Sequence, residues 1–308
     1  MSPVSSTFVC EAIVFKKVVI FGVGLIGGSF ALALRRAHPA TQFIGVGRSA
    51  QSLERARELG IIDAIATDPA AAVAGADLVL LAAPVAQTEA ILTSIAEHLE
   101  AHAIVTDAGS TKSDVVAAAR KALGARIAQF VPAHPIAGRE KHGPEAALAD
   151  LYEGKKVVIA ALPENRVHDV EAVAAAWRAC GAVIHHLSPQ EHDAVFASVS
   201  HLPHVLAFAL VDDIARKPHA ATLFQYAASG FRDFTRIAGS SPEMWRDITL
   251  ANRDALLVEV DTYLAQLQAM RAMIAADDGA ALEKIYTNAQ HARLEWAAAI
   301  EAAERKPG

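Results

Sequence analysis

The sequence has few cysteines and no excess of basic residues, and both shortages exclude classes of function. Its 308 residues include two cysteines, Cys10 and Cys180, which lie far apart and form neither a metal-ligand motif nor a redox pair. This usage indicates reduced thiols and a cytoplasmic protein. The formal net charge is −6. Nucleic acids and anionic membranes need a basic protein face, so neither is expected as a partner.

A long hydrophobic run free of glycine is also missing. Residues 18–34 carry no charge and follow two lysines, as a signal anchor would. They contain four glycines, however, and about 17 residues is the lower limit of a membrane span. The first part is β-branched and the second part helix-forming, which predicts a strand, a tight turn and a buried helix.

Strand and helix patterns alternate through the first part of the chain. Helical patterns cover residues 25–36 and 49–59. Apolar runs typical of strands occupy residues 17–21, 42–46, 77–82, 104–107, 127–131, 155–160 and 182–186. This alternation predicts βαβ units and an α/β fold with a mostly parallel, doubly wound sheet of the Rossmann type.

The strand patterns end near Ser188, and helical patterns follow. Residues 190–216, 242–273 and 280–305 are each expected to form a single helix. We therefore expect a dinucleotide-binding domain at 1–188 and an all-α domain at 189–308. Apolar residues recur there at helical spacing: Leu256, Val260, Leu264, Leu267 and Ile274. This stripe fits a helical core and equally a homodimer interface.

A glycine-rich motif lies between the first expected strand and the first helix. It has the pattern G-x-G-x-x-G, and the residues expected to contact a cofactor are Gly22, Gly24, Leu25, Ile26 and Gly27. The glycines permit a tight turn, close approach of the main chain to a pyrophosphate, and packing of helix on strand. In this strand–turn–helix context the motif predicts dinucleotide binding.

The acid that usually binds the adenosine ribose is missing at the end of the second strand. The sequence there is Gly45-Val46-Gly47-Arg48-Ser49. A glycine in that place removes repulsion against a 2′-phosphate, and Arg48 and Ser49 supply a guanidinium and a hydroxyl to bind it. The pattern favours NADP. NAD stays open, because Arg48 is also explained as a solvated residue at a helix start.

Two polar segments follow later strands. The segment from Asp107 to Lys112 carries Ser110, and Thr111-x-x-Asp114 fits a helix capping box. His134 is expected on a Pro/Gly-rich loop after the strand at 127–131. Carboxyl ends of parallel strands meet at one edge, so the Ser110 hydroxyl could orient the His134 imidazole there. His134 is then a candidate general base, although a histidine before proline is often structural.

Three more segments carry a resemblance. They are Ser198-Val199-Ser200-His201-Leu202-Pro203-His204, Gly230-Phe231-Arg232-Asp233-Phe234-Thr235-Arg236 and Met244-Trp245-Arg246. Together with D-x-G-S-x-K and H-P-I-A-G, they resemble the prephenate/arogenate dehydrogenase family of tyrosine biosynthesis, from residue 17 to about residue 274. The resemblance implies an oxidoreductase that uses NAD(P) to convert a cyclohexadiene into an aromatic ring with loss of CO₂.

The resemblance also implies roles for single residues. His134 matches the catalytic histidine that accepts the hydrogen bond of the substrate hydroxyl. Ser110 matches the serine that holds this histidine and the substrate. Arg236 matches the arginine that binds the ring carboxylate, and His204 and Trp245 match residues of the substrate pocket.

Two positions leave the substrate open. Arg139 stands where many family members carry threonine, and Glu140 follows it. An extra cation near the substrate side chain favours the keto acid prephenate, whereas Glu140 could bind the amine of arogenate. Prephenate dehydrogenase is the prediction, and arogenate or dual-specificity cyclohexadienyl dehydrogenase is the alternative.

Other classes fit less well. A β-hydroxyacid or 6-phosphogluconate-type dehydrogenase needs a catalytic lysine in the first interdomain helix, and residues 190–216 contain none. A non-catalytic NADP sensor is not expected to keep His134, Ser110 and Arg236 together. His201 and His204 have the spacing of zinc ligands without a third ligand, so no metal is predicted.

Overall fold

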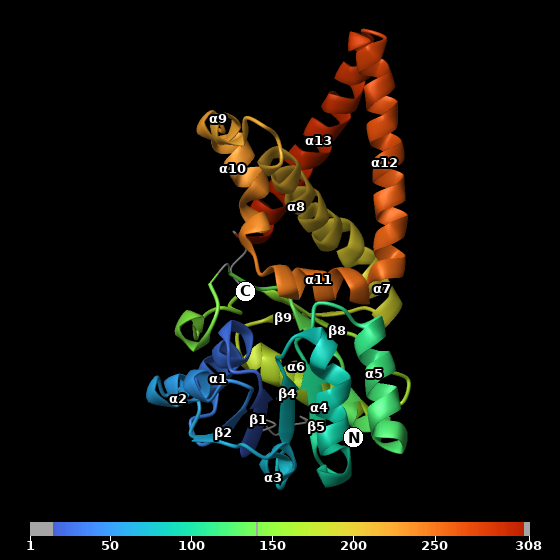
Figure 1. Cartoon of the computed structure of the whole chain (residues 1–308). Coiled ribbons are helices and arrows are strands. Elements are labelled where there is room, and N and C mark those ends of the chain that lie inside the picture. Colours follow the sequence, from blue (N-terminus) through green and yellow to red (C-terminus); the bar gives the residue numbers. More distant parts are fainter. Residues whose placement is uncertain (1–14, 140, 305–308) are drawn as a thin grey trace, which may run out of the picture. The chain divides into compact units, whose positions relative to one another are not determined.

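The computed structural model describes residues 15–139 and 141–304. The chain divides into two compact units, one up to Leu256 and one from Leu257. A six-stranded parallel sheet forms the centre of the first unit, in the order β3-β2-β1-β4-β5-β6 (Figure 1). This is the order of a doubly wound dinucleotide-binding sheet, which reverses between β1 and β4. The strands are β1 (Lys17–Phe21), β2 (Gln42–Val46), β3 (Ala64–Ile65), β4 (Leu78–Leu81), β5 (Ile104–Asp107) and β6 (Phe130–Val131).

Helices cover both faces of this sheet, which confirms the predicted fold class. Val18 and Ile20 of β1 pack on one side with the first group of helices, and Val19 and Phe21 pack on the other side with the second group. The first group is α1 (Leu25–Ala37), α2 (Ala50–Glu58) and α6 (Val167–Ala179); the second is α3 (Pro69–Val73), α4 (Thr88–Ile95) and α5 (Ser113–Leu123). Both faces are buried, so the strands are continuously apolar.

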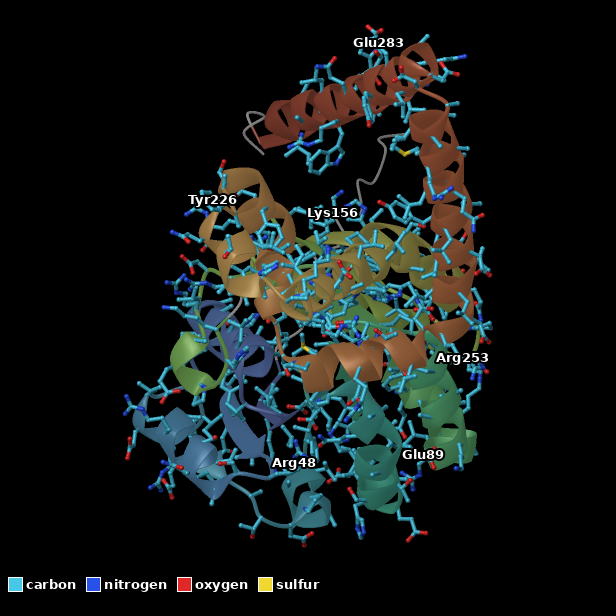
Figure 2. All side chains as sticks on the ribbon, turned by 45° about the horizontal axis from the view of Figure 1, so that its top comes forward. Arg48, Glu89, Lys156, Tyr226, Arg253 and Glu283 are labelled. Atoms are coloured by element: carbon cyan, nitrogen blue, oxygen red, sulfur yellow. The ribbon has the colours of Figure 1, made fainter. Side chains whose placement is uncertain are left out.

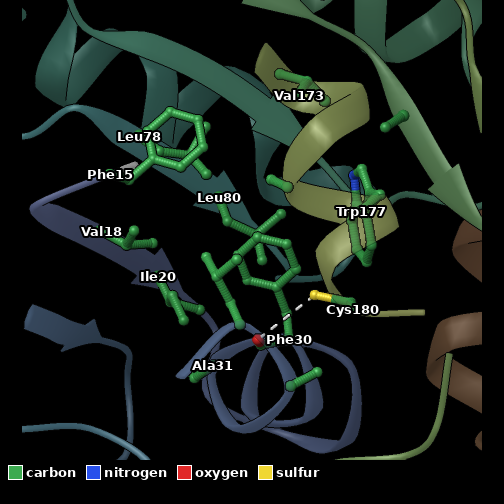
Figure 3. Close-up of a cluster of buried hydrophobic side chains, with 14 of the residues drawn as sticks. Phe15, Val18, Ile20, Phe30, Ala31, Leu78, Leu80, Val173, Trp177 and Cys180 are labelled. Carbon is green, nitrogen blue, oxygen red and sulfur yellow. Dashed lines mark hydrogen bonds between the residues drawn. The ribbon is translucent and has the colours of Figure 1, made fainter. Parts of the chain in front are cut away.

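An aromatic cluster fixes the helix that follows the glycine motif. The Trp177 ring packs edge-on against Phe30 of α1, with ring centroids 4.7 Å apart (Figure 3). The Tyr152 hydroxyl donates a hydrogen bond of 2.6 Å to the carbonyl of Ile26, in the first turn of α1. Cys180 lies in the same cluster, and burial raises the pKa of its thiol. The cluster thus holds the start of α1 in place and keeps this thiol unreactive.

His134 lies in a short strand, so the prediction of a loop is wrong. A second sheet has the order β7-β8-β9, with β7 (Ala133–Pro135) antiparallel to β8 (Lys156–Ile159) and β8 parallel to β9 (Val183–His186). The strand predicted at 127–131 is mostly a 3₁₀ turn, Gly124–Gln129, and only β6 pairs. Pro132 has no N–H for the parallel ladder, so the chain leaves the first sheet there and enters the second.

The predicted all-helical region is confirmed, but its first long helix has an irregular turn. α7 (Pro189–Phe196) continues through a π-helical turn, Ala197–His201, into α8 (Leu202–Ala215). Pro203 has no N–H to close a regular turn, which accounts for the wider one just before it. The run from Pro189 to Ala215 is long and apolar enough to span a membrane by length and composition alone. It carries three buried polar residues, His192, Asp193 and His201.

The second predicted helix, at 242–273, is two helices. α11 (Pro242–Ala251) ends at Asn252, whose side chain is buried, and α12 (Arg253–Ala275) follows. Two short helices precede them, α9 (Ala220–Gln225) and α10 (Ser229–Thr235). The break at Asn252 places an amide group inside the first unit.

In the second unit, the rest of α12 is followed by α13 (Gly279–Glu304). Asp277 adopts a left-handed conformation, with φ 55°, at the turn between the helices. Of the predicted stripe, Leu264, Leu267 and Ile274 are 50%, 43% and 63% exposed in the single chain. These side chains are therefore not covered by an intrachain core.

Candidate active site

A cavity of about 570 Å³ lies over the glycine-rich turn, at the carboxyl ends of β1 and β2. Gly22, Gly24, Val46, Arg48 and Ser49 are among its lining residues. Leu25 and Ile26 form the first turn of α1, whose N-cap is Gly24. The partial positive charge of this helix end favours an anion at the cavity.

The three motif glycines are required for different reasons. Gly22 has φ +96°, and a Cβ there would lie 2.7 Å from the carbonyl oxygen of Ala82. A Cβ on Gly27 would lie 2.3 Å from the carbonyl oxygen of Gly22. A Cβ on Gly24 would meet nothing within 4 Å. Packing therefore requires glycine at positions 22 and 27, while the open space over Gly24 fits the pyrophosphate of a dinucleotide.

The two residues predicted to select the cofactor both line the cavity. Arg48, which is labelled in Figure 2, lines the cavity together with Thr67 and with Pro69, the first residue of α3. Ser49 is the N-cap of α2, and its hydroxyl accepts a hydrogen bond of 3.2 Å from the main chain of Ser52. None of the described lining residues is acidic. We call Gly22, Gly24, Gly27, Arg48 and Ser49 the cofactor cradle.

A buried ion pair fixes the loop that carries Ser110. The ammonium of Lys112, which is 0% exposed, pairs with Oδ2 of Asp107. The same oxygen accepts a hydrogen bond of 2.8 Å from the main chain of Gly109, and Oδ1 accepts one of 3.0 Å from Ala133. The pair thus ties the carboxyl end of β5 to the residue that precedes His134.

The capping box predicted at Thr111 and Asp114 is wrong. α5 begins at Ser113, and no side chain of its own caps it. Instead, the carboxylate of Asp193, from α7, accepts hydrogen bonds from the main-chain N–H groups of Lys112 and Ser113 at 2.8 and 2.7 Å. A cap from another helix satisfies the free donors and also fixes the carboxylate.

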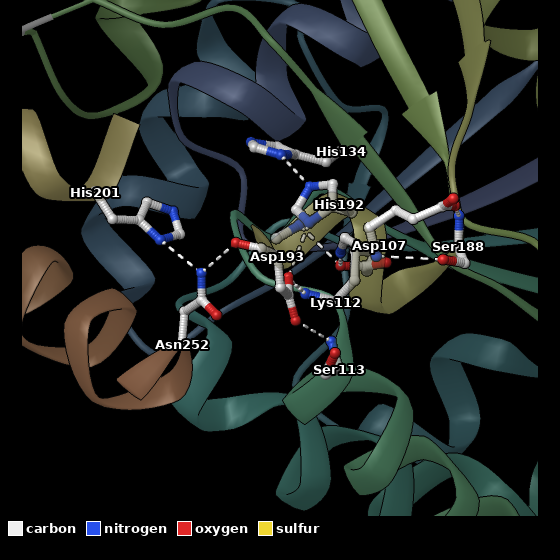
Figure 4. A network of polar contacts seen from close by, with 11 residues as sticks. Asp107, Lys112, Ser113, His134, Ser188, His192, Asp193, His201 and Asn252 are labelled. Carbon is white, nitrogen blue, oxygen red and sulfur yellow. Dashed lines mark hydrogen bonds and ion pairs between the residues drawn. The ribbon is translucent and has the colours of Figure 1, made fainter. Parts of the chain in front are cut away.

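His134 contacts a second histidine that the sequence did not single out. Nδ1 of His134 lies 2.8 Å from Nε2 of His192, and Nδ1 of His192 lies 2.8 Å from Oδ1 of Asp193 (Figure 4). His192 is fully buried, whereas His134 is half-buried. Both rings pack against Phe196, with centroids 4.9 and 4.4 Å from its ring.

The pKa shifts keep both rings neutral and the carboxylate charged. Burial lowers the pKa of His134 well below its ordinary value, and His192 and Lys112 lower it further. Burial also lowers the pKa of His192, and the hydrogen bond to Asp193 only partly opposes this. Burial alone would raise the pKa of Asp193, but the hydrogen bonds from His192, Ser113 and Lys112 lower it overall. A neutral imidazole is the form that a general base requires.

A second branch leads from Asp193 to the other predicted site residues. The amide nitrogen of Asn252 donates to the main-chain oxygen of Asp193 at 2.8 Å and to Nδ1 of His201 at 3.0 Å. Burial lowers the pKa of His201 to about 4. We call His134, His192, Asp193, Asn252 and His201 the histidine network.

Three of the predicted substrate-binding residues lie close together. The His204 ring stacks on Trp245, with centroids 3.5 Å apart and an angle of 18° between the planes. Its Nδ1 donates to the carbonyl of Ser200 at 2.8 Å. Burial lowers the pKa of His204, and the nearby guanidinium of Arg236 adds to this effect.

The remaining predicted residues are less defined. Among the hydrogen bonds of the described residues, none joins Ser110 to His134. A main-chain hydrogen bond with Ser110 instead acts on His201, where it raises the pKa and so opposes the effect of burial. Arg139 is exposed. Glu140 lies outside the described residues.

This doubly wound sheet, with a dinucleotide cradle and a neutral imidazole at its carboxyl edge, is that of an NAD(P)-dependent dehydrogenase. Residues 30–186 match the family described as "Prephenate dehydrogenase, nucleotide-binding domain", and residues 188–288 match "Prephenate dehydrogenase, dimerization domain". The chain belongs to the prephenate dehydrogenase family, which confirms the resemblance seen in its motifs.

Individual relatives agree with this family. The chain is 36% identical to a cyclohexadienyl dehydrogenase of Zymomonas mobilis, over 91% of this chain and 96% of the relative. It is also 36% identical to a prephenate dehydrogenase of Bacillus subtilis, over 90% of this chain and 75% of the relative. The structure resembles that of a prephenate dehydrogenase from A. aeolicus in complex with hydroxyphenyl propionate and NAD+, with a TM-score of 0.86, 36% identity and coverage of 92% and 99%.

Proposed function

We propose that the protein catalyses the NAD(P)-dependent oxidative decarboxylation of prephenate to 4-hydroxyphenylpyruvate, a step of tyrosine biosynthesis. The observation that carries this proposal is the neutral, half-buried imidazole of His134 at the carboxyl edge of a dinucleotide-binding sheet. A bound nicotinamide supplies the acceptor for the hydride of the carbinol carbon. His134 takes the proton of the substrate hydroxyl, and loss of the ring carboxylate as CO₂ makes the ring aromatic.

The other site residues bind and orient the substrate in this proposal. The guanidinium of Arg236 holds the ring carboxylate, because a planar cation suits a carboxylate. The stacked rings of His204 and Trp245 form a wall of the substrate pocket, and the Ser110 hydroxyl orients the substrate against His134. We assign Arg139 and Glu140 to recognition of the substrate side chain, as the sequence predicts. The alternative is arogenate dehydrogenase or dual-specificity cyclohexadienyl dehydrogenase, and the second of these is the name that the Zymomonas mobilis relative carries.

NADP is the preferred cofactor in this proposal, and NAD is the second choice. Arg48 and Ser49 line the cavity, and no described lining residue would repel a 2′-phosphate. The structure of the relative from A. aeolicus contains NAD+, which supports NAD as the second choice.

The helical region completes the proposal as a domain for substrate binding and dimerisation. We place the division at 188/189 and expect a cytoplasmic homodimer. The exposed apolar side chains of α12 and the match to a dimerization domain support the dimer. Light scattering at micromolar concentration should give twice the chain mass; a monomer with full activity would contradict the dimer.

The experiment that tests the function is a matrix of two substrates and two cofactors. Purified protein is assayed with prephenate and with arogenate, each with NAD+ and NADP+, while reduced cofactor and released CO₂ are both measured. We expect one CO₂ for each reduced cofactor and the highest kcat/KM for prephenate with NADP+. Activity confined to arogenate would transfer the function to the alternative. Reduction without CO₂ would contradict the proposed reaction.

A further inference from the structure

We propose that His192 and Asp193 are positioning residues that hold His134 in the one neutral tautomer able to act as a base. This inference rests on the proposed function, because it assumes that His134 accepts the substrate proton. It adds two residues that contact the base through its far nitrogen, on the side away from the chemistry.

The tautomers follow from which atoms can donate. An ionised carboxylate only accepts, so the 2.8 Å contact between Asp193 and His192 requires the proton of His192 to be on Nδ1. A neutral imidazole has one N–H, so Nε2 of His192 carries a lone pair. The 2.8 Å contact to His134 then requires His134 to donate from its own Nδ1. Nε2 of His134 is left with a lone pair, which is the atom that must accept the substrate proton.

The chain of contacts is anchored so that it cannot change direction. The Asp193 carboxylate accepts two main-chain hydrogen bonds from the start of α5, and its own carbonyl accepts one from Asn252. The positive end of α5 also favours the ionised carboxylate. The His192 ring is fully buried against Phe196. Three elements, α5, α7 and the junction of α11 and α12, therefore fix the acceptor on which the tautomer of His134 depends.

The same arrangement suits the step after proton transfer. When Nε2 of His134 has taken the proton, Nδ1 keeps its N–H and still donates to His192, so no side chain has to move. The charged groups around the two rings are Lys112, Asp107 and Asp193, and the first two are paired with each other. Asp193 is then the carboxylate left to stabilise the imidazolium.

The test compares variants of His192 that differ in one acceptor atom. His192→Gln keeps an amide oxygen near the place of Nε2, whereas His192→Leu has no acceptor. We expect His192→Leu to lose roughly 10²-fold in kcat, which is less than the ~10⁴-fold loss seen when a wrong tautomer is imposed on a serine-protease histidine. His192→Gln should stay within roughly tenfold of wild type. In both variants, KM for the substrate and Kd for NADP+ should change less than threefold, because His192 is not placed against a ligand.

The tautomer is read directly by ¹⁵N NMR of histidine-labelled protein, with His134 assigned as the signal lost in His134→Asn. Wild type should show a protonated Nδ1 and an unprotonated Nε2, and His192→Leu should shift this pattern towards Nε2–H. Asp193→Asn should shift it in the same direction. A wild-type His134 protonated at Nε2 would overturn the inference, whether or not any variant folds.

The chain offers a matched control in His168, which also precedes an aspartate and lies 3.3 Å from it, but has a side chain that is 76% exposed. His168→Leu should leave kcat and the His134 signals unchanged. The two proposals fail differently. Full activity of His134→Asn would contradict the proposed function. An inactive His134→Asn, with folded His192→Leu and Asp193→Asn of wild-type kcat, would overturn only the positioning role.

Discussion

The cofactor cradle and the histidine network lie on one sheet edge but are built from different materials. The cradle consists of three glycines, the open space above them and the two exposed side chains of Arg48 and Ser49. The network consists of the half-buried His134 of β7 and of buried side chains from α7, the π-helical turn and the end of α11. Substitution of one residue beside such a cradle leaves the rest of the cradle in place, whereas loss of one side chain from a network of buried polar groups leaves its hydrogen-bond partners unsatisfied. Substitutions in the two regions should therefore fail in different ways.

The largest effect is expected in the network. His134→Asn should lower kcat by roughly 10²–10⁴-fold, because Asn cannot take up the proton of the substrate hydroxyl. Binding of NADP+, measured by fluorescence titration, should barely change, since the cradle is intact. Turnover within threefold of wild type would remove His134 from the mechanism and erase the contrast between the two regions.

The buried ion pair between Lys112 and Asp107 should contribute strongly to the stability of the fold. Lys112→Met leaves the Asp107 carboxylate buried without its partner, which costs about 3–5 kcal/mol in a protein interior. Urea unfolding at pH 7 measures this loss. The matched control is Lys121→Met, which breaks an exposed pair with Glu89 (side chains 72% and 46% exposed) and should cost at most about 1 kcal/mol. Equal losses of unfolding free energy in both variants would show that burial does not make the Lys112 pair more important for stability than an exposed pair.

A smaller and more selective effect is expected in the cradle. Arg48→Ala should lower kcat/KM with NADP+ by roughly 10–150-fold, because a charge-assisted contact contributes about 1.5–3 kcal/mol. Use of NAD+ and the free energy of unfolding should hardly change. The control is Ser52→Ala, which also lines the cavity but bears no charge. An equal loss with both cofactors would show that Arg48 does not bind the 2′-phosphate.

The same contrast explains what could be predicted from the sequence. The strands at 17–21, 42–46 and 104–107 were predicted with the bounds that the structure has, because apolar runs between turn residues are a local signal. The glycine motif is local as well. The strand predicted at 127–131 is shorter in the structure, because residues Gly124–Gln129 form a 3₁₀ turn and only Phe130 and Val131 pair. His134 joins a second sheet through pairing with β8, which the local pattern does not indicate.

The network was missed for a related reason. His192 and Asp193 form a His-Asp dipeptide on a helix, and so do His168 and Asp169. Only the first pair contacts His134, from 58 residues away along the chain. The Ser188 capping box predicts where α7 begins but not what α7 packs against. Which of two identical dipeptides is used depends on tertiary packing, and the sequence pattern carries no signal for it.

The smallest effect expected is a pH dependence of stability that comes from the network. Burial lowers the pKa of His201 to about 4 from an ordinary value of 6.5, with Asp193 opposing the shift and His192 and His204 adding to it. The unfolded chain then binds a proton more readily than the folded one. The resulting stability is present above about pH 6.5 and is lost as the pH falls towards 4. Between pH 7 and pH 5.5, the titration of His201 should lower the free energy of unfolding by about 1 kcal/mol.

His201→Gln tests this, because its amide can still pair with Asn252 but does not titrate. Its loss of unfolding free energy over the same pH interval should be smaller than that of wild type by about 1 kcal/mol. His168→Gln, on the exposed His-Asp pair, should follow wild type. If the two variants gave the same pH dependence, the buried histidine would be titrating like a surface one. The histidine network would then be open to water, and the contrast with the cofactor cradle would no longer hold.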